Sequence, residues 1–92
     1  MGIYRISFSP QALKDVSKLQ KSEPIAFKKL SKLVKELEEN PKIGTGKPKP
    51  LGGDRAGQWS RRITDKHRLV YEIKDEEVLV LVLSSWGHYD DK

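Results

Sequence analysis

The sequence has 92 residues and a mass of 10.5 kDa, which predicts a single domain, residues 1–92, around one modest hydrophobic core. Charged residues make up 34% of the chain, yet Leu, Val and Ile recur in ordered patterns, which excludes a disordered chain. The absence of cysteine excludes disulfide scaffolds, thiolate metal sites and cysteine nucleophiles. The longest apolar run, residues 78–83, is far shorter than the about 20 residues of a membrane-spanning helix, and the first residues contain no apolar signal segment. We therefore expect a cytoplasmic protein.

The net charge of +5 is concentrated in one part of the chain. Residues 42–68 contain eight basic and two acidic residues, a net charge of +6, which leaves −1 for all other residues. A concentrated positive segment on a small domain is typical of proteins that bind a polyanion, because each phosphate contact releases counterions. The alternative is a solvated basic surface without a partner, and charge alone does not separate the two.

Residues 3–8 alternate in the way that is typical of a strand with one face in the core. The core-facing side chains are Tyr4, Ile6 and Phe8. Ser9 and Pro10 then indicate a helix start, with Ser9 as the N-cap and Pro10 at the first helical position, where its missing N–H costs nothing. The predicted helix has a narrow apolar stripe, formed by Leu13, Val16 and Leu19.

A second helix is predicted to begin at Glu23-Pro24 and to end at Asn40-Pro41. Its apolar residues keep helical spacing; they are Phe27, Leu30, Leu33, Val34 and Leu37. Only a short break at residues 21–22 separates the two helices, so we expect them to form a helical hairpin.

Residues 42–57 are rich in glycine and proline, and predict a long loop that carries lysines. Such a loop inside a small domain is more often functional than accidental. Three strand-like runs follow, at residues 59–63, 68–73 and 78–83. Their short connections, at 65–66 and 75–76, imply antiparallel hairpins. The last run does not alternate, which favours a central strand covered on both faces. The predicted order is β-α-α-β-β-β.

Several side chains are of the types that metal-independent cleavage of RNA requires. This reaction needs a deprotonated 2′-hydroxyl, a protonated leaving 5′-oxygen, and stabilised charge on the phosphate. His88, just after the last predicted strand, is of the residue type that exchanges protons near neutral pH. The cations that could gather around one phosphate are Arg61, Arg62, Arg68, Lys47 and Lys49. Two histidines alone make a poor metal site, so we expect no metal and no other cofactor.

These residues also have ordinary structural interpretations. An arginine on a strand usually belongs to the polar face, and a lone histidine near a C-terminus is usually solvated. Arg61 differs, because it shares its alternating face with Trp59 and Ile63 and therefore needs an anion among apolar groups. His67, in a predicted hairpin turn, is interpreted as structural or idle.

Five motifs stand out along the chain: Gly46-Lys47-Pro48, Pro50-Leu51, GQWSRRIT at 57–64, HRLVY at 67–71 and His88-Tyr89. Together they strongly resemble the YoeB/Txe toxins of the RelE superfamily. The resemblance spans nearly the whole chain, and the combination is far more specific than any single motif. It implies a bacterial type II toxin that docks in the ribosomal A site, cuts messenger RNA there, and is silenced by a YefM-like antitoxin. It also implies a RelE-like α+β fold, commonly a homodimer, with two N-terminal helices on a twisted, mostly antiparallel four-stranded sheet.

The resemblance also assigns roles by position. It implies that Arg68 stabilises the phosphate, that His88 is the general acid and that Tyr89 is the terminal tyrosine of the catalytic site. The implied RNA-contacting residues are Lys47, Arg61 and Arg62.

One position departs from the family. The family usually has Gly-Lys-Pro-Glu, with the glutamate as general base, and this chain has Lys49 in place of that glutamate. An ammonium group cannot accept a proton, so we expect Lys49 to stabilise the phosphate and cleavage to be slower than in a glutamate-bearing relative.

The sequence suggests three functions, and it argues against the third because the family resemblance puts Arg68 and His88 at catalytic positions. The first is a ribosome-dependent endoribonuclease toxin. The second is a toxin-fold protein that binds the ribosome or the antitoxin but cuts weakly or not at all, because Lys49 replaces the base. The third is a small RNA-binding module in which Trp86 and Tyr89 stack on bases, although these two rings could equally seal the end of the core.

Overall fold

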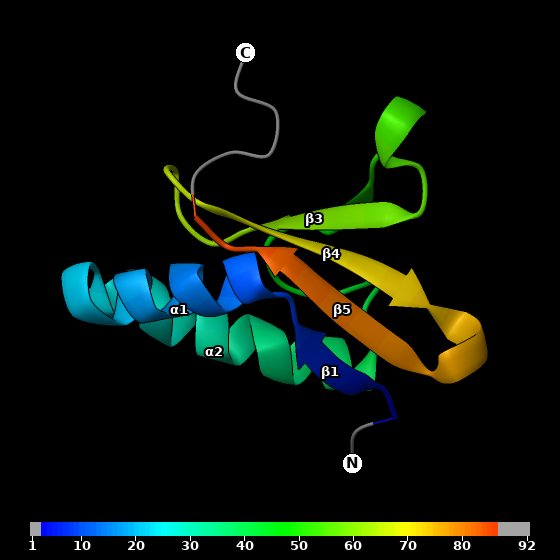
Figure 1. Cartoon of the computed structure of the whole chain (residues 1–92), viewed down its shortest axis with the longest axis horizontal. Helices are drawn as coiled ribbons and strands as arrows, with labels where there is room; N and C mark the ends of the chain where they lie inside the picture. Colours follow the sequence, from blue (N-terminus) through cyan, green and yellow to red (C-terminus); the bar gives the residue numbers. More distant parts are fainter. Residues whose placement is uncertain (1–2, 87–92) are drawn as a thin grey trace.

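The computed structural model describes residues 3–86, in which two helices cover one face of a five-stranded sheet (Figure 1). The helices are α1 (Pro10–Ser22) and α2 (Pro24–Glu39). The strands are β1 (Arg5–Phe8), β2 (Lys49–Pro50), β3 (Gln58–Arg62), β4 (Arg68–Lys74) and β5 (Leu79–Ser84). Two short 3-10 helices, η1 (Gly53–Arg55) and η2 (Asp75–Glu77), precede β3 and β5.

Helix α1 begins where the sequence predicts. The Ser9 hydroxyl accepts a hydrogen bond from the Ala12 N–H at 3.0 Å, and Pro10 occupies the first turn. The expected apolar stripe is wrong at Leu13, whose exposed fraction is 58%. The buried face of α1 is instead formed by Ala12, Asp15 and Leu19. Asp15, which was not among the predicted core residues, is buried, and its carboxylate accepts a hydrogen bond from the Ser85 N–H at 3.0 Å.

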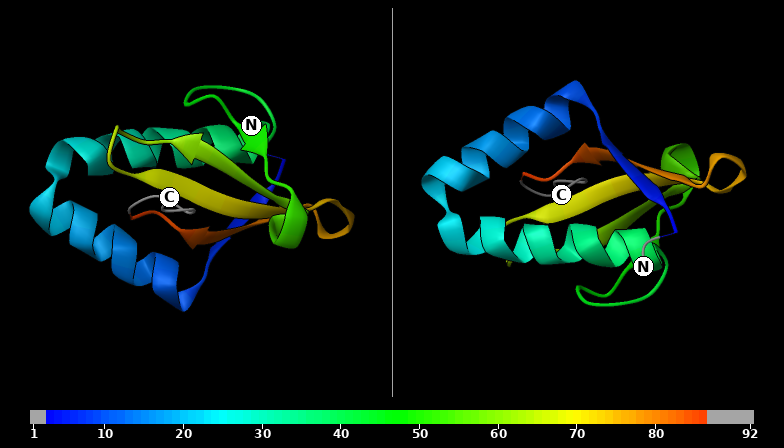
Figure 2. Two further views of the ribbon diagram at one scale, coloured as in Figure 1. Left: turned by 90° about the horizontal axis from the view of Figure 1, so that it is seen from above. Right: turned by 90° about the horizontal axis from the view of Figure 1, so that it is seen from below.

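Helix α2 confirms the predicted second helix and the helical hairpin. It ends at Glu39 with Asn40 as its C-cap, and its buried residues are Ala26, Leu30, Leu33 and Leu37. Figure 2 shows that the two helices diverge from a tight turn at residue 23. Their buried side chains meet Ile63, just after β3, and the buried side chains of the sheet, which are Leu69, Tyr71, Val80 and Val82.

The strand order in the sheet is β1-β5-β4-β3-β2. Both predicted hairpins are confirmed, since β3–β4 and β4–β5 pair antiparallel. β1 pairs in parallel with β5, so β5 lies inside the sheet, as its unalternating sequence predicts. The expectation that both faces of β5 are covered is wrong, because Val80 and Val82 are buried under the helices while Leu79 and Leu81 on the other face are partly exposed.

The expected number of four strands is wrong, because the predicted loop contains a short fifth strand. β2 has only two residues, and Lys49 and Pro50 pair with Ser60 and Trp59 of β3. A proline is tolerated there because β2 is an edge strand. Two residues are too few for any alternation, so no sequence pattern marks this strand.

Neither helix of the described chain is long and apolar enough to span a bilayer.

Candidate anion-binding site

Neighbouring arginines of β3 point to opposite faces of the sheet, because successive side chains alternate along a strand. Arg61 lies opposite Leu69 of β4 and faces the core. Arg62 lies opposite Arg68, on the face away from the helices. The expectation that strand arginines converge is therefore met by Arg62 and Arg68, and Arg61 diverges from them.

A pocket of about 240 Å³ opens on the Arg62 face of the sheet. Its described lining residues are Gly46, Lys47, Lys49, Arg62 and Arg68, four of them cationic and none acidic. Three strands and the preceding loop supply these residues, so side chains from residues 46–68 meet in one place. Lysine and arginine side chains gathered in this way form a site for an anion with several oxygens, such as a phosphate.

The loop reaches the pocket through a tight approach to β3. The Gly46 carbonyl accepts a hydrogen bond from the Arg62 N–H at 2.8 Å. A Cβ atom on Gly46 would lie 2.6 Å from the Arg62 carbonyl oxygen, and the φ of Gly46 is +87°, so only glycine fits there. Lys47 follows with a φ of +52°, a left-handed conformation that is rare for a residue with a side chain.

Arg61 does not line the pocket. Its exposed fraction is 0%, and its guanidinium donates hydrogen bonds to Glu36, Tyr71 and backbone carbonyls. This corrects the expectation that Arg61 contacts RNA, because a buried guanidinium whose donors are already used cannot bind an added phosphate.

The anion that Arg61 requires is Glu36 of α2. Arg61 Nη1 lies 2.9 Å from Glu36 Oε1. Burial works to raise the pKa of Glu36, but hydrogen bonds from the Thr45 N–H and hydroxyl, together with Arg61, outweigh it and the pKa is lowered. The carboxylate is therefore charged at neutral pH. Sequence reasoning predicted an anion beside Arg61, and the missed partner is an acidic residue on the otherwise apolar stripe of α2.

Within the described part of the chain, no three His, Cys, Asp or Glu side chains are grouped as metal ligands would be.

The sequence model of one protein family, described as "YoeB-like toxin of bacterial type II toxin-antitoxin system", matches residues 8–89. The chain belongs to this family. It is 40% identical to Toxin RelK of Mycobacterium tuberculosis over 76 residues, which are 83% of this chain and 89% of the relative. It is 37% identical to Toxin YoeB of Escherichia coli K12, over 83% of this chain and 90% of the relative.

Solved structures of YoeB toxins share the fold. The YoeB/ParE toxin from Agrobacterium tumefaciens superposes with a TM-score of 0.87 at 33% identity, over 92% of this chain and 99% of that one. The YoeB dimer from Staphylococcus aureus has a TM-score of 0.82 at 36% identity, over 95% and 99% of the two chains. The Staphylococcus aureus YoeB–YefM complex has a TM-score of 0.81 at 37% identity, over 94% and 98%. The α+β fold and the family resemblance are thus confirmed, and this YoeB-like chain is a toxin of a type II toxin–antitoxin system.

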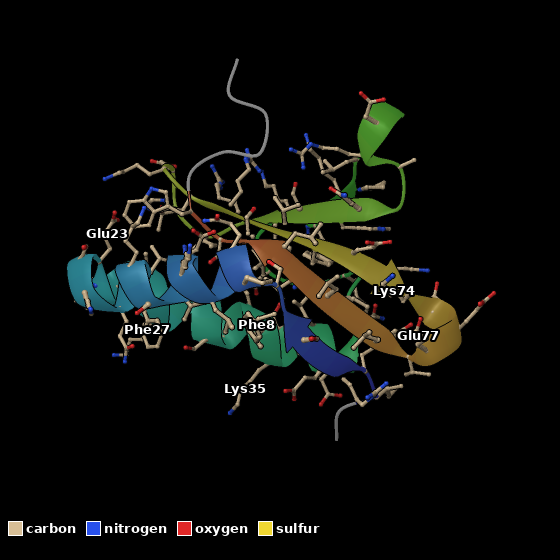
Figure 3. The ribbon with its side chains drawn as sticks, viewed as in Figure 1. Phe8, Glu23, Phe27, Lys35, Lys74 and Glu77 are labelled. Carbon is tan, nitrogen blue, oxygen red and sulfur yellow. The ribbon has the colours of Figure 1, made fainter. Side chains whose placement is uncertain are left out.

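Two aromatic residues of this YoeB-like toxin have structural roles. The His67 ring is 2% exposed, lies 2.9 Å from Glu23 Oε2, and has its centroid 4.4 Å from that of Trp86. The hydrogen bond with His67 lowers the pKa of Glu23, which Figure 3 shows at the turn between the helices. His67 is therefore structural, as one interpretation held, and it is not idle. Trp86 packs against the core and seals its end, with Lys18 Nζ 4.5 Å from its ring.

The remaining predicted site residues, His88 and Tyr89, lie outside the described residues. The Ser85 N–H donates to the buried carboxylate of Asp15, and Ser85 itself is 0% exposed.

Proposed function

We propose that this chain is a ribosome-dependent endoribonuclease that cleaves messenger RNA in the ribosomal A site. The observation that carries this proposal is the cationic pocket lined by Lys47, Lys49, Arg62 and Arg68, on a chain that belongs to the YoeB-like toxins. Its four cations match the charge of an RNA backbone and of a phosphate that gains negative charge during cleavage.

The reaction is attack of the 2′-oxygen on the adjacent phosphorus, with departure of the 5′-oxygen. Arg68 and Lys49 stabilise the charge on the phosphate. His88 donates a proton to the leaving 5′-oxygen, and Tyr89 completes the site. Because an ammonium cannot accept a proton, removal of the 2′-hydroxyl proton passes to a group other than Lys49 or is slow.

Substrate binding falls to Lys47 and Arg62 at the edge of the pocket. Arg61 is left out of this role because it is buried against Glu36. The proposed site has no strong nucleophile of its own, so the ribosome must supply most of the acceleration by holding the message in position.

The proposed partners besides messenger RNA and the ribosome are a YefM-like antitoxin and a second copy of the chain. Two of the similar solved structures, both from Staphylococcus aureus, are a YoeB–YefM complex and a YoeB dimer. An antitoxin with an acidic segment would cover the pocket or displace the tail that carries His88, because the pocket attracts anionic chains. Expression of the toxin alone should inhibit growth, and co-expression with the antitoxin should restore it.

A second candidate function is binding of the ribosome and the antitoxin with weak or absent cleavage. It is favoured by one observation, since Lys49 lines the pocket at the position where the family usually has its glutamate base.

Primer extension on ribosome-bound message with purified protein tests the two candidates. The endoribonuclease proposal predicts cuts in the A-site codon that are much faster than cuts in free RNA, and Arg68→Ala should remove them. Ribosome binding without cuts would favour the second candidate. Equal cutting of free and ribosome-bound RNA would contradict the role of the ribosome.

A further inference from the structure

Behind the pocket, an ion pair between the buried Arg61 and the partly exposed Glu36 joins the helical layer, the loop and the sheet. Arg61 donates from Nε to the Tyr71 hydroxyl at 3.1 Å and from Nη1 to Glu36 Oε1 at 2.9 Å. Nη2 donates to the Asn40 and Ile43 carbonyls at 2.9 and 2.7 Å. One side chain of β3 therefore holds two carbonyls of the segment that connects α2 to the pocket.

Glu36 holds the next part of that segment. Its Oε1 accepts from the Thr45 N–H at 2.8 Å, and its Oε2 accepts from the Thr45 hydroxyl at 2.8 Å. Tyr71 also holds this segment, because its hydroxyl donates a hydrogen bond to the Pro41 carbonyl at 2.8 Å. Burial raises the pKa of Tyr71, so the phenol keeps the proton that this bond requires.

The fixed residue Thr45 lies directly before the pocket residues. Gly46 and Lys47 follow it, and Lys49 is two residues further along. The left-handed φ of +52° at Lys47 is a conformation that persists only where the surrounding structure imposes it. Placing Lys47 and Lys49 beside Arg62 and Arg68 also brings like charges together, which favours an open loop unless another contact holds it closed.

We propose that Glu36 and Arg61 are positioning residues that hold the loop at residues 44–49 in the conformation that lines the pocket. The proposal deepens the proposed function, since it assigns the placement of Lys47 and Lys49 to an ion pair on the opposite face of the sheet. Neither residue touches the substrate. Their effect on cleavage passes through the loop.

Two variants test the proposal. Glu36→Gln removes the charge and keeps the shape of the side chain. A buried guanidinium without its counter-charge can destabilise the protein enough to unfold it. The second variant is therefore Glu36→Leu/Arg61→Met, which removes both charges together. Glu38→Gln, on the same helix and with the same change in charge, is the matched control, and urea unfolding shows which variants are folded.

The rate of limited trypsin digestion reports how often the loop opens, and this measurement does not require the protein to be catalytically active. The bonds after Lys47 and Lys49 precede proline and resist trypsin, so the cut between Lys42 and Ile43 reports opening of this segment. The cut after Arg55, in η1, is the internal reference. We expect cleavage after Lys42 to become faster, on the order of tenfold, in both test variants, with no change after Arg55 or in Glu38→Gln. Unchanged protection of the 42–43 bond in both folded variants would overturn the proposal.

Single-turnover cleavage of ribosome-bound message measures how loss of the ion pair affects the rate of the reaction in the pocket. The rate constant at saturating ribosomes should fall, on the order of 100-fold in the double variant, with partial recovery in Glu36→Asp relative to Glu36→Ala. If the variants only reduced the fraction of folded protein, the amplitude of cleavage would fall and the rate constant would stay unchanged. That result would also overturn the proposal. If the wild-type chain does not cut the message at all, the proposed function fails, and the trypsin experiment still decides whether the ion pair holds the loop.

Discussion

Arg62 and Arg68 lie directly opposite each other across the β3–β4 ladder. The Arg62 N–H points away from β4, to the Gly46 carbonyl, so this is a non-hydrogen-bonded pair, the kind in which side chains stand closest. Like charges in such a pair destabilise a sheet. Asp65, 3.6 Å from Arg62, offsets little of this because its side chain is 98% exposed. The two facing charges therefore work against the stability of the sheet, and they fit the anion-binding role that we propose for the pocket.

The first prediction concerns this repulsion. Arg62→Gln should raise the free energy of unfolding by up to about 1 kcal/mol at low salt, because it removes one of two facing charges. The gain should shrink at high salt, which screens exposed charges. Urea unfolding at two salt concentrations measures both effects, with Arg5→Gln on the exposed face of β1 as the control. A loss of stability at low salt would contradict the prediction.

The second prediction separates catalysis from binding in the pocket. Arg68→Ala should lower the single-turnover rate constant more than it weakens ribosome binding, because a group that acts on transition-state charge affects the chemical step. Lys47→Ala should chiefly weaken binding and reduce its dependence on salt. Rate constants and ribosome affinities measured over a range of salt distinguish the two residues. Equal losses in both variants would mean that they form only an electrostatic surface.

The third prediction concerns Lys49. Lys49→Glu restores the residue that the family usually has, at a position in β2 that already lines the pocket. If a missing base limits the reaction, the single-turnover rate should rise and gain an acid limb in its pH profile. An unchanged or lower rate would show that Lys49 is an adequate catalytic group, and the expectation of a slowed enzyme would be wrong.

The fourth prediction is loss of stability in acid. The pKa values of Glu36 and Glu23 are both below the ordinary value of 4.5, so folding favours their charged forms. The stability that they contribute is present above pH 4.5 and is lost as the pH falls through their lowered values. Urea unfolding between pH 7 and pH 3 should show this loss, and its slope with pH should be smaller in Glu36→Gln. An identical slope in wild type and Glu36→Gln would exclude Glu36 as a source.

Local signals in the sequence predicted much of the fold. The Ser9 cap, the prolines at the helix starts and the short hairpin connections depend on neighbouring residues, and the structure confirms them. The prediction that Leu13 faces the core was wrong: the core-facing side of α1 includes Asp15, whose carboxylate accepts from the Ser85 N–H, a contact 70 residues away in the sequence. Spacing within a helix contains no information about such a partner.

The candidate site was predictable only in part. Alternation along β3 showed that Arg61 faces the core and needs an anion, yet 25 residues separate Arg61 from Glu36, and no local pattern pairs them. The family resemblance placed both Arg61 and Arg62 among the RNA-contacting residues. The burial of Arg61 in the structure is what shows that its role differs from that of Arg62. The sequence analysis expected Lys47, Lys49, Arg62 and Arg68 to gather around one anion, but the pairing that places Lys49 beside β3 lies in β2, which is too short to predict.

The parallel pairing of β1 with β5 sets the order in which this chain can mature. β1 is made first and lies at one edge of the sheet, and its described strand partner is made last. The helical hairpin relies on contacts close in sequence and can form early, while β1 stays without its partner until residues 79–84 have been synthesised. A growing chain that has β2, β3 and β4 therefore still lacks a complete sheet. For a protein that we propose acts on ribosomes, this connectivity means that the sheet behind the pocket is incomplete until residues 79–84 have been made.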